Sequence, residues 1–155
     1  MRRNEREVTD LNEIHDILQR CDTIRLGMND AEYPYVIPMT FGSEIIDGRI
    51  VIYFHSAADG KKWEILNKDP RVCVEADLYY RVEKKESGAI TAIYESVIGT
   101  GKAYLLTEQS DKINALKVML AKYKETGFPV TSCKGLPNVA VFKVTLDDVS
   151  GKHNL

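Results

Sequence analysis

The sequence lacks the long apolar run that a membrane-spanning helix needs. No stretch of its 155 residues approaches about 20 consecutive apolar side chains. The charged N-terminal residues are not followed by the apolar segment of a secretory signal peptide. We therefore expect a soluble, unprocessed protein that resides in the cytoplasm.

Cysteine is scarce as well. Cys21, Cys73 and Cys133 lie far apart, and no CxxC pair occurs. Such spacing argues against a zinc cluster, and the odd number argues against a disulfide framework. Free thiols agree with a reducing cytoplasm.

An excess of one charge is also missing. The chain carries 21 Lys and Arg against 23 Asp and Glu, a formal net charge of -2. A nearly neutral protein has no general attraction for nucleic acid, so any anion site must be local. The 44% of hydrophobic residues can fill one core, and we expect a single domain over residues 1–155.

Several common catalytic motifs do not occur. The pattern G-x-x-x-x-G-K-[ST] of nucleotide-binding loops fails because Trp63 follows Lys62. Neither G-x-S-x-G nor H-E-x-x-H is present. His15, His55 and His153 stand in unrelated contexts, which suggests no metal site.

The sequence does contain a series of short β-rich segments. Asp47-Gly48, between two of them, is a strong hairpin signal. Consecutive antiparallel strands favour a barrel over a β-α-β sheet, so the fold class is mainly β with flanking helices. The expected strands are residues 23–28, 35–41, 49–55, 71–80, 94–106 and 139–146.

Helical spacing of apolar residues predicts three helices between these strands. Asp10, with Glu13 three residues later, resembles a capping box for a helix over residues 10–20. A short helix covers residues 61–67, and Thr107 is the expected cap of a third helix. The buried stripe of the third helix would comprise Ile113, Leu116, Leu120 and Tyr123.

Two irregular regions complete this interpretation. Residues 81–92 are polar enough for a solvent-exposed loop. Gly99 and Gly101 suggest a bulge in the long strand. Pro38 cannot donate a hydrogen bond to a neighbouring strand, so it requires a sheet edge, a bulge or a ligand-facing gap.

The densest group of polar residues lies around the short helix. His55 and Ser56 leave a strand, and Asp59-Gly60-Lys61-Lys62 enters the helix. A helix N-terminus with two lysines can bind phosphate. Alternatively, the lysines form a solvated helix face while Ser56 and Asp59 cap the helix. His55 alone could be a metal ligand, a general acid or base, a hydrogen-bond donor or a structural residue.

Several segments match a known family in their order and spacing: residues 2–7, 35–41, 52–57, 60–62, 67–72, 96–101 and 150–152. They resemble the FMN-binding half of the pyridoxamine 5'-phosphate oxidase-like proteins. The chain is most similar to the nitroimidazole-resistance subgroup. The resemblance implies a six-stranded antiparallel split β-barrel and a homodimer with flavin mononucleotide (FMN) at its interface.

The resemblance also implies a set of cofactor contacts. Lys61 and Lys62 would hold the FMN phosphate, and His55 and Ser56 would approach the phosphate or the ring. Ser96 would be contributed by the partner subunit. Backbone groups of one strand would run along the isoalloxazine edge. The implied cofactor-binding residues are Tyr35, Val36, Ile37, Pro38, Met39, His55, Ser56, Gly60, Lys61, Lys62 and Ser96.

These features suggest an FMN-dependent reductase of small acceptors such as nitroimidazoles, with His55 as the candidate catalytic residue. Oxidation of vitamin B6 is disfavoured, because residues 150–155 offer no counterpart of the substrate-binding histidine and arginine of the true oxidases. One alternative is a non-catalytic protein that binds flavin, haem or deazaflavin. Another is a barrel dimer that serves only as an interaction scaffold.

Overall fold

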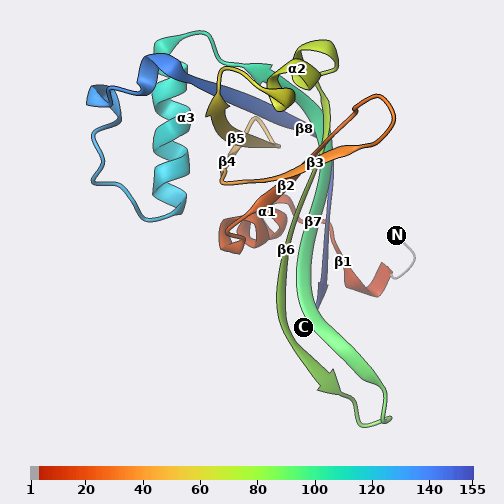
Figure 1. Cartoon of the computed structure of the whole chain (residues 1–155). Helices are drawn as coiled ribbons and strands as arrows, with labels where there is room; N and C mark the ends of the chain where they lie inside the picture. The colour runs from red at the N-terminus through yellow and green to blue at the C-terminus, as the bar shows by residue number, and fades with distance from the viewer. Residues whose placement is uncertain (1–3) are drawn as a thin grey trace.

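The computed structural model describes residues 4–155, so Arg2 and Arg3 of the N-terminal motif lie outside the described residues (Figure 1). The α-helices are α1 (Leu11–Arg20), α2 (Lys61–Lys68) and α3 (Gln109–Lys122). Short 3-10 turns are η1 (Asn4–Arg6), η2 (Val130–Ser132) and η3 (Leu136–Asn138). The strands are β1 (Glu7–Val8), β2 (Ile24–Met28), β3 (Tyr35–Met39), β4 (Gly42–Ile46), β5 (Arg49–Ala57), β6 (Arg71–Lys84), β7 (Ile90–Leu105) and β8 (Val139–Asn154).

The strands form one antiparallel sheet in the order β3-β2-β6-β7-β8-β5-β4, and β1 pairs with β8. β3 and β4 are the two ends of this order, yet only residues 40–41 separate them in the chain. The sheet must therefore curl until its two edges meet, which makes a barrel that stays open between β3 and β4. The expected fold class, an antiparallel split β-barrel with flanking helices, is confirmed.

Two packed clusters stabilise the barrel. Ile50, Ile52 and Phe54 of β5 point into the main core, which α1 also enters with Ile17 and Leu18. The intervening residues of β5 face α3, because successive side chains of a strand point to opposite faces. There, a second cluster contains Val51, Tyr53, Ala115, Met119 and Val141. β5 is thus buried on both faces along most of its length.

Three predictions that depend on residues close together in the sequence are confirmed. The Asp10 side chain accepts a hydrogen bond of 2.9 Å from the Glu13 N–H at the start of α1. Asp47-Gly48 closes the β4–β5 hairpin, with Ile46 opposite Arg49. A register shift between β7 and β8 falls at Thr100/Gly101. The predicted bulge therefore lies beside Gly101, where a Cβ would meet the Thr145 carbonyl oxygen.

Other details of the sheet differ from the prediction. The structure adds β1 and β4 to the six expected strands, and β4 pairs across the Asp47-Gly48 turn in place of residues 35–41. The expected loop over residues 81–92 is mostly strand, because β6 continues to Lys84 and β7 begins at Ile90. Most side chains of this outer hairpin are exposed, so no alternation of polar and apolar residues marks it.

The third helix also begins later than expected. Glu108, rather than Thr107, is its N-cap, and no side-chain hydrogen bond caps it. Its buried residues are Ala115 and Met119. Gly42 permits this packing, because a Cβ there would lie 2.7 Å from the backbone nitrogen of Met119. The close approach of β4 selects the buried face of α3, and the predicted stripe is only half-buried.

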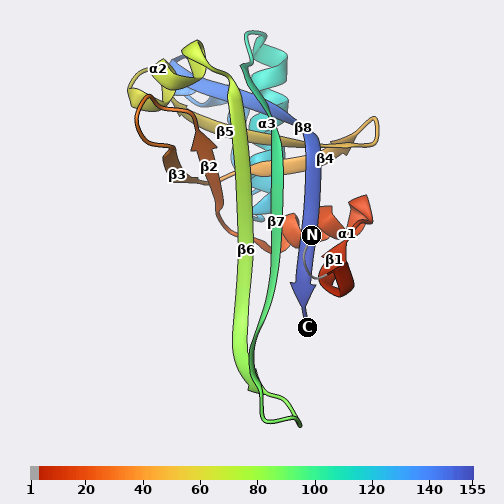
Figure 2. The same cartoon turned by 90° about the vertical axis from the view of Figure 1, so that its right-hand side faces the viewer.

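The β6–β7 hairpin extends well beyond the barrel (Figure 2). Its outer part carries exposed apolar side chains, among them Tyr79, Val82 and Ile90. Within residues 4–155, no helix is both long and apolar enough to cross a membrane.

Candidate functional site

β3 forms one edge of the sheet. Its described pairing is with β2, where Pro38 lies opposite Arg25. An edge strand leaves alternate backbone N–H and C=O groups without a strand partner. The edge position predicted for Pro38 is confirmed. Val36 and Pro38 point outward and are exposed, whereas Tyr35, Ile37 and Met39 are half-buried.

The N-terminus of α2 lies in the turn that follows β5. Gly60 precedes the helix at φ 89° and ψ 176°, a conformation that glycine alone adopts readily. No side chain caps α2, and the Ser56 hydroxyl donates to the Ala57 carbonyl oxygen at 2.7 Å. The structure therefore does not show the alternative in which Ser56 and Asp59 cap the helix. The first N–H groups of α2 remain available to an anion.

The two lysines of this turn have different surroundings. The exposed Lys61 places its Nζ atom 2.7 Å from Oδ2 of Asp30 and 4.8 Å from the Tyr35 ring centroid. The hydrogen bond to Asp30 raises the pKa of Lys61. Lys62 is half-buried, with Nζ 3.6 Å from Sδ of Met39 and 5.9 Å from the Phe54 ring centroid. Burial lowers the pKa of Lys62.

The different surroundings make Lys62 the stronger candidate for binding an anion. Among the described residues, no carboxylate forms an ion pair with Lys62, whereas Lys61 already has one. A partly desolvated ammonium gains most from a new negative partner, because it has already lost part of its hydration. We therefore expect Lys62 to contribute the larger share of phosphate binding.

His55 and Ser56 lie on opposite faces of β5. His55 follows Val51 and Tyr53 on the face toward α3, and Ser56 lies on the barrel side. His55 is exposed as a whole residue, but partial desolvation of its imidazole, and then the charge of Lys62, lower its pKa. The imidazole is therefore neutral near pH 7 and can donate one hydrogen bond. The charge of Lys62 acts on His55, although the described contacts of Lys62 are with Met39 and Phe54.

Ser96 lies elsewhere. It sits on β7 between Asp77 of β6 and Lys152 of β8, and Lys152 in turn pairs with Glu7. Ser96 thus lies in the part of the sheet near the two chain termini, away from the turn before α2. Within one chain, Ser96 therefore does not join the other candidate residues. Any contribution to the site would have to come from a second subunit.

Asp30 is a site residue that the sequence analysis missed. Asn29-Asp30-Ala31-Glu32 suggests a turn, and nothing local indicates a contact with Lys61. The pairing depends on how the β2–β3 connection lies against α2. A concavity of about 500 Å³ separates these elements, with Asp30, Lys61 and Lys68 in its wall.

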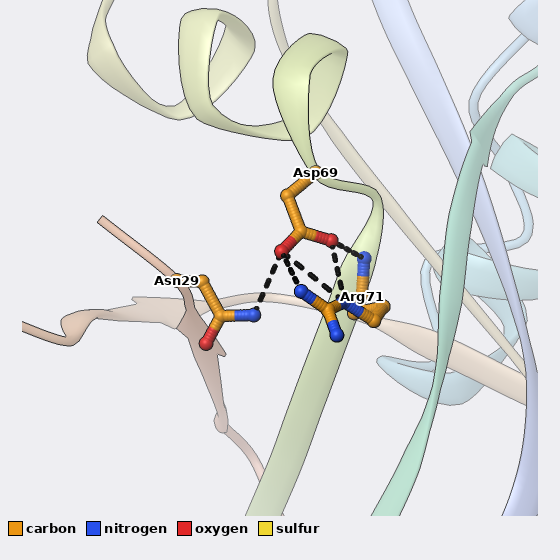
Figure 3. A network of polar contacts seen from close by, with 3 residues as sticks. All are labelled: Asn29, Asp69 and Arg71. Carbon is orange, nitrogen blue, oxygen red and sulfur yellow. Dashed lines mark hydrogen bonds and ion pairs between the residues drawn. The ribbon is translucent and has the colours of Figure 1, made fainter. Parts of the chain in front are cut away.

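A polar network holds the Asp30 segment in place (Figure 3). Oδ2 of Asp69 accepts hydrogen bonds from Nδ2 of Asn29 at 2.9 Å and from the Arg71 guanidinium at 2.7 Å. Oδ1 accepts from the Arg71 backbone N–H at 3.1 Å. The Arg71 hydrogen bonds, followed by that of Asn29, hold the pKa of Asp69 well below its usual range. The network joins the end of β2 to the connection between α2 and β6.

The fold and this geometry define a class: split barrels with a cationic helix N-terminus beside a free strand edge. Residues 10–153 match the family model described as pyridoxamine 5'-phosphate oxidase. The chain belongs to this family. A search of curated protein sequences finds no match.

Solved structures agree with this assignment. A proposed 5-nitroimidazole antibiotic resistance protein from Bacteroides thetaiotaomicron is 28% identical at a TM-score of 0.82, over 94% of this chain and 85% of that chain. The flavocytochrome Anf3 from Azotobacter vinelandii is 19% identical at a TM-score of 0.79, over 100% of this chain and 72% of that chain. A FAD-binding protein from Mesorhizobium loti is 22% identical at a TM-score of 0.67, over 95% of this chain and 96% of that chain. The resemblance to the nitroimidazole-resistance subgroup is confirmed.

Proposed function

We propose that this protein is an FMN-dependent reductase of small acceptors such as nitroimidazoles. The observation that carries the proposal is the half-buried, unpaired ammonium of Lys62 at the uncapped start of α2, 3.6 Å from Sδ of Met39 on the edge strand. A cation beside a free strand edge suits a cofactor that has a phosphate at one end and a hydrogen-bonding planar ring at the other.

The residues present fit FMN. Lys62, Lys61 and the first N–H groups of α2 would hold the phosphate. The free backbone edge of residues 36–39 would face the ring, and Pro38 leaves no unused donor there. The space beside Gly60 is open, since a Cβ built at this position would meet no atom within 4 Å. When bound, the flavin supplies two-electron redox chemistry between a reduced donor and an acceptor.

His55 would assist this chemistry through hydrogen bonding. Its lowered pKa keeps the imidazole neutral, so the side chain can donate a hydrogen bond or a proton to a group beside the flavin. An approaching phosphate would oppose the effect of the Lys62 charge. The protonation of His55 would then depend on whether a phosphate is bound at Lys62.

The proposed assembly is a homodimer. A projecting two-stranded hairpin has little stability of its own, and exposed apolar side chains on it require cover. A second copy can provide that cover and can bring its Ser96 to the flavin. The FAD-binding and flavocytochrome neighbours support flavin as the cofactor class.

The first experiment is the absorption spectrum of the purified protein before and after FMN is added, with mass spectrometry of any released ligand. We expect flavin bands and micromolar or tighter binding. Lys61→Ala together with Lys62→Ala should reduce FMN affinity at least tenfold. The matched control replaces Lys112 and Lys117 of α3 with alanine. Equal affinities in both double variants would contradict the phosphate site.

A second candidate function is a non-catalytic protein that binds flavin, haem or deazaflavin. It is favoured by neighbours that include a protein described as binding FAD and haem, from Mycobacterium smegmatis, at 14% identity and a TM-score of 0.79. Turnover separates the candidates. A reductase should reoxidise its reduced flavin faster when a nitroimidazole is added, whereas a binding protein should show no such acceleration. An interaction scaffold should bind none of these three cofactors.

A further inference from the structure

A second concavity lies on the other side of His55. It encloses about 640 Å³ between α3, the 3-10 turns η2 and η3, and the end of β5. Met119 and Leu116 of α3 form one wall, and Val130 and Leu136 form the opposite wall. Phe128 stands at the rim and is 61% exposed. The concavity is open to solvent, so a ligand can enter it, and its volume lies in the range of small-molecule sites.

The walls of this cavity are held in place on both sides. The Tyr123 hydroxyl accepts a hydrogen bond from the Phe41 N–H at 3.1 Å and donates to the Asp22 carbonyl oxygen at 2.7 Å. Lys122 donates to the Leu18 carbonyl oxygen at 2.8 Å. These contacts fix the end of α3. Val130 and Leu136 are buried and anchor the opposite wall.

The chemistry of the lining selects a kind of ligand. The surface is almost wholly apolar, with aromatic rings from Tyr123 and Phe128. Glu125 contributes a carboxylate, which disfavours anions. His55 is a polar group at the side of the sheet, and its neutral imidazole can hydrogen-bond an uncharged acceptor atom. An uncharged aromatic molecule with one polar edge fits this combination.

We propose that the cavity between α3, η2, η3 and His55 binds a small, uncharged aromatic molecule. Its role as the acceptor site rests on the function proposed above, since His55 lines this cavity and is influenced by the charge of Lys62. Binding of the aromatic molecule does not require the flavin. The two ideas can therefore fail separately.

Methionine methyl groups give a direct test on the full chain. Met119 lines the cavity, and Met39 contacts Lys62 in the proposed flavin site. With ¹³C-methyl methionine, nitrobenzene should shift the Met119 signal in a saturable way, and FMN should shift the Met39 signal. Benzoate, which has the same ring but a negative charge, should bind at least fivefold more weakly. If FMN shifts the Met39 methyl signal but millimolar nitrobenzene does not shift the Met119 signal, the cavity proposal is wrong. The proposed flavin site would be unaffected by that result.

Blocking the cavity supplies the second arm of the test. Leu116→Trp should weaken nitrobenzene binding at least tenfold, whereas Tyr104→Trp, at an exposed position of β7 away from the cavity, should leave it unchanged. If Leu116→Trp does not fold, benzyl methanethiosulfonate can label the exposed Cys133 at the cavity wall in a Cys73→Ser background. Undiminished binding after either block would overturn the proposal. So would a Met119 signal that moves with protein concentration, because a second copy would then occupy the cavity.

Discussion

At the scale of single residues, Lys61 and Lys62 show how position decides the use of identical side chains. Asp30 balances the charge of Lys61, whereas Lys62 lies against Met39 and Phe54. The pKa values accordingly shift in opposite directions, upward for Lys61 and downward for Lys62. Asp30 must therefore compete with any phosphate for Lys61. This competition can be measured.

Replacing Asp30 with asparagine should tighten FMN binding. The change removes a carboxylate 2.7 Å from Nζ of Lys61 and frees that ammonium for the phosphate. Exposed ion pairs are weak because solvent screens them, so we expect a Kd lower by about fivefold at most. The matched control is Asp59→Asn, on an exposed carboxylate in the α2 turn. Fluorescence titration with FMN gives both values. Weaker binding in Asp30→Asn would show that Asp30 positions Lys61 and does not compete for it.

The neighbouring charge of Lys62 should also be visible in the titration of His55. Burial and Lys62 together lower the pKa of His55 from its ordinary value of 6.5. Lys62→Gln removes the second cause, so the pKa of His55 should rise. Lys61→Gln should leave it nearly unchanged. NMR of the imidazole protons against pH checks both variants, and a His55→Gln variant assigns the signal. An unchanged pKa in Lys62→Gln would place Lys62 too far from His55 to act on it.

At the scale of elements, most features that depend on residues close together in the sequence could be predicted, whereas features that depend on tertiary packing could not. The α1 cap and the Asp47-Gly48 turn each depend on residues a few positions apart. β4 was missed because residues 42–46 follow directly on residues 35–41, so the two strands read as one. The outer hairpin was missed because its side chains are exposed on both faces.

The residues of the candidate site also differ in whether the sequence could predict their proximity. His55, Ser56, Gly60, Lys61 and Lys62 are nearly contiguous, so their proximity follows from the sequence. Asp30 is distant in the chain and reaches Lys61 only through the packing of the β2–β3 connection against α2. The wall of the apolar cavity comes from α3 and from turns after it, and no periodic pattern indicates such an assembly.

The entry into α2 depends on Gly60. At φ 89° and ψ 176°, any other residue costs about 1–3 kcal/mol even without a clash. Gly60→Ala should therefore lower the free energy of unfolding by that amount and weaken FMN binding, because the α2 N-terminus would rotate. Gly127→Ala is the control, since a Cβ there also meets no atom within 4 Å and its φ is not positive. Equal stability of the two variants in urea would contradict this account of the turn.

At the scale of the whole molecule, the shape is uneven. The barrel has a well-packed core, whereas the β6–β7 hairpin projects from it without a comparable apolar partner (Figure 2). Val82 is 56% exposed and Ile90 is 75% exposed on this hairpin. Soluble monomers seldom maintain a projecting apolar ribbon of this kind. The shape is therefore better suited to a pair of chains than to one.

Charges placed on the hairpin should separate such a pair. Val82→Glu together with Ile90→Glu should shift the mass measured by light scattering from two chains toward one, since four carboxylates would enter an apolar interface. Flavin retention should fall with it, because Ser96 of a second chain would be lost from the site. Tyr104→Glu is the control, because Tyr104 is similarly exposed but lies on the part of β7 that pairs with β8. If the double variant stays paired and keeps FMN, the hairpin does not form the interface. If it becomes monomeric and keeps FMN at full affinity, the flavin site is complete within one chain, and the role proposed for Ser96 is wrong.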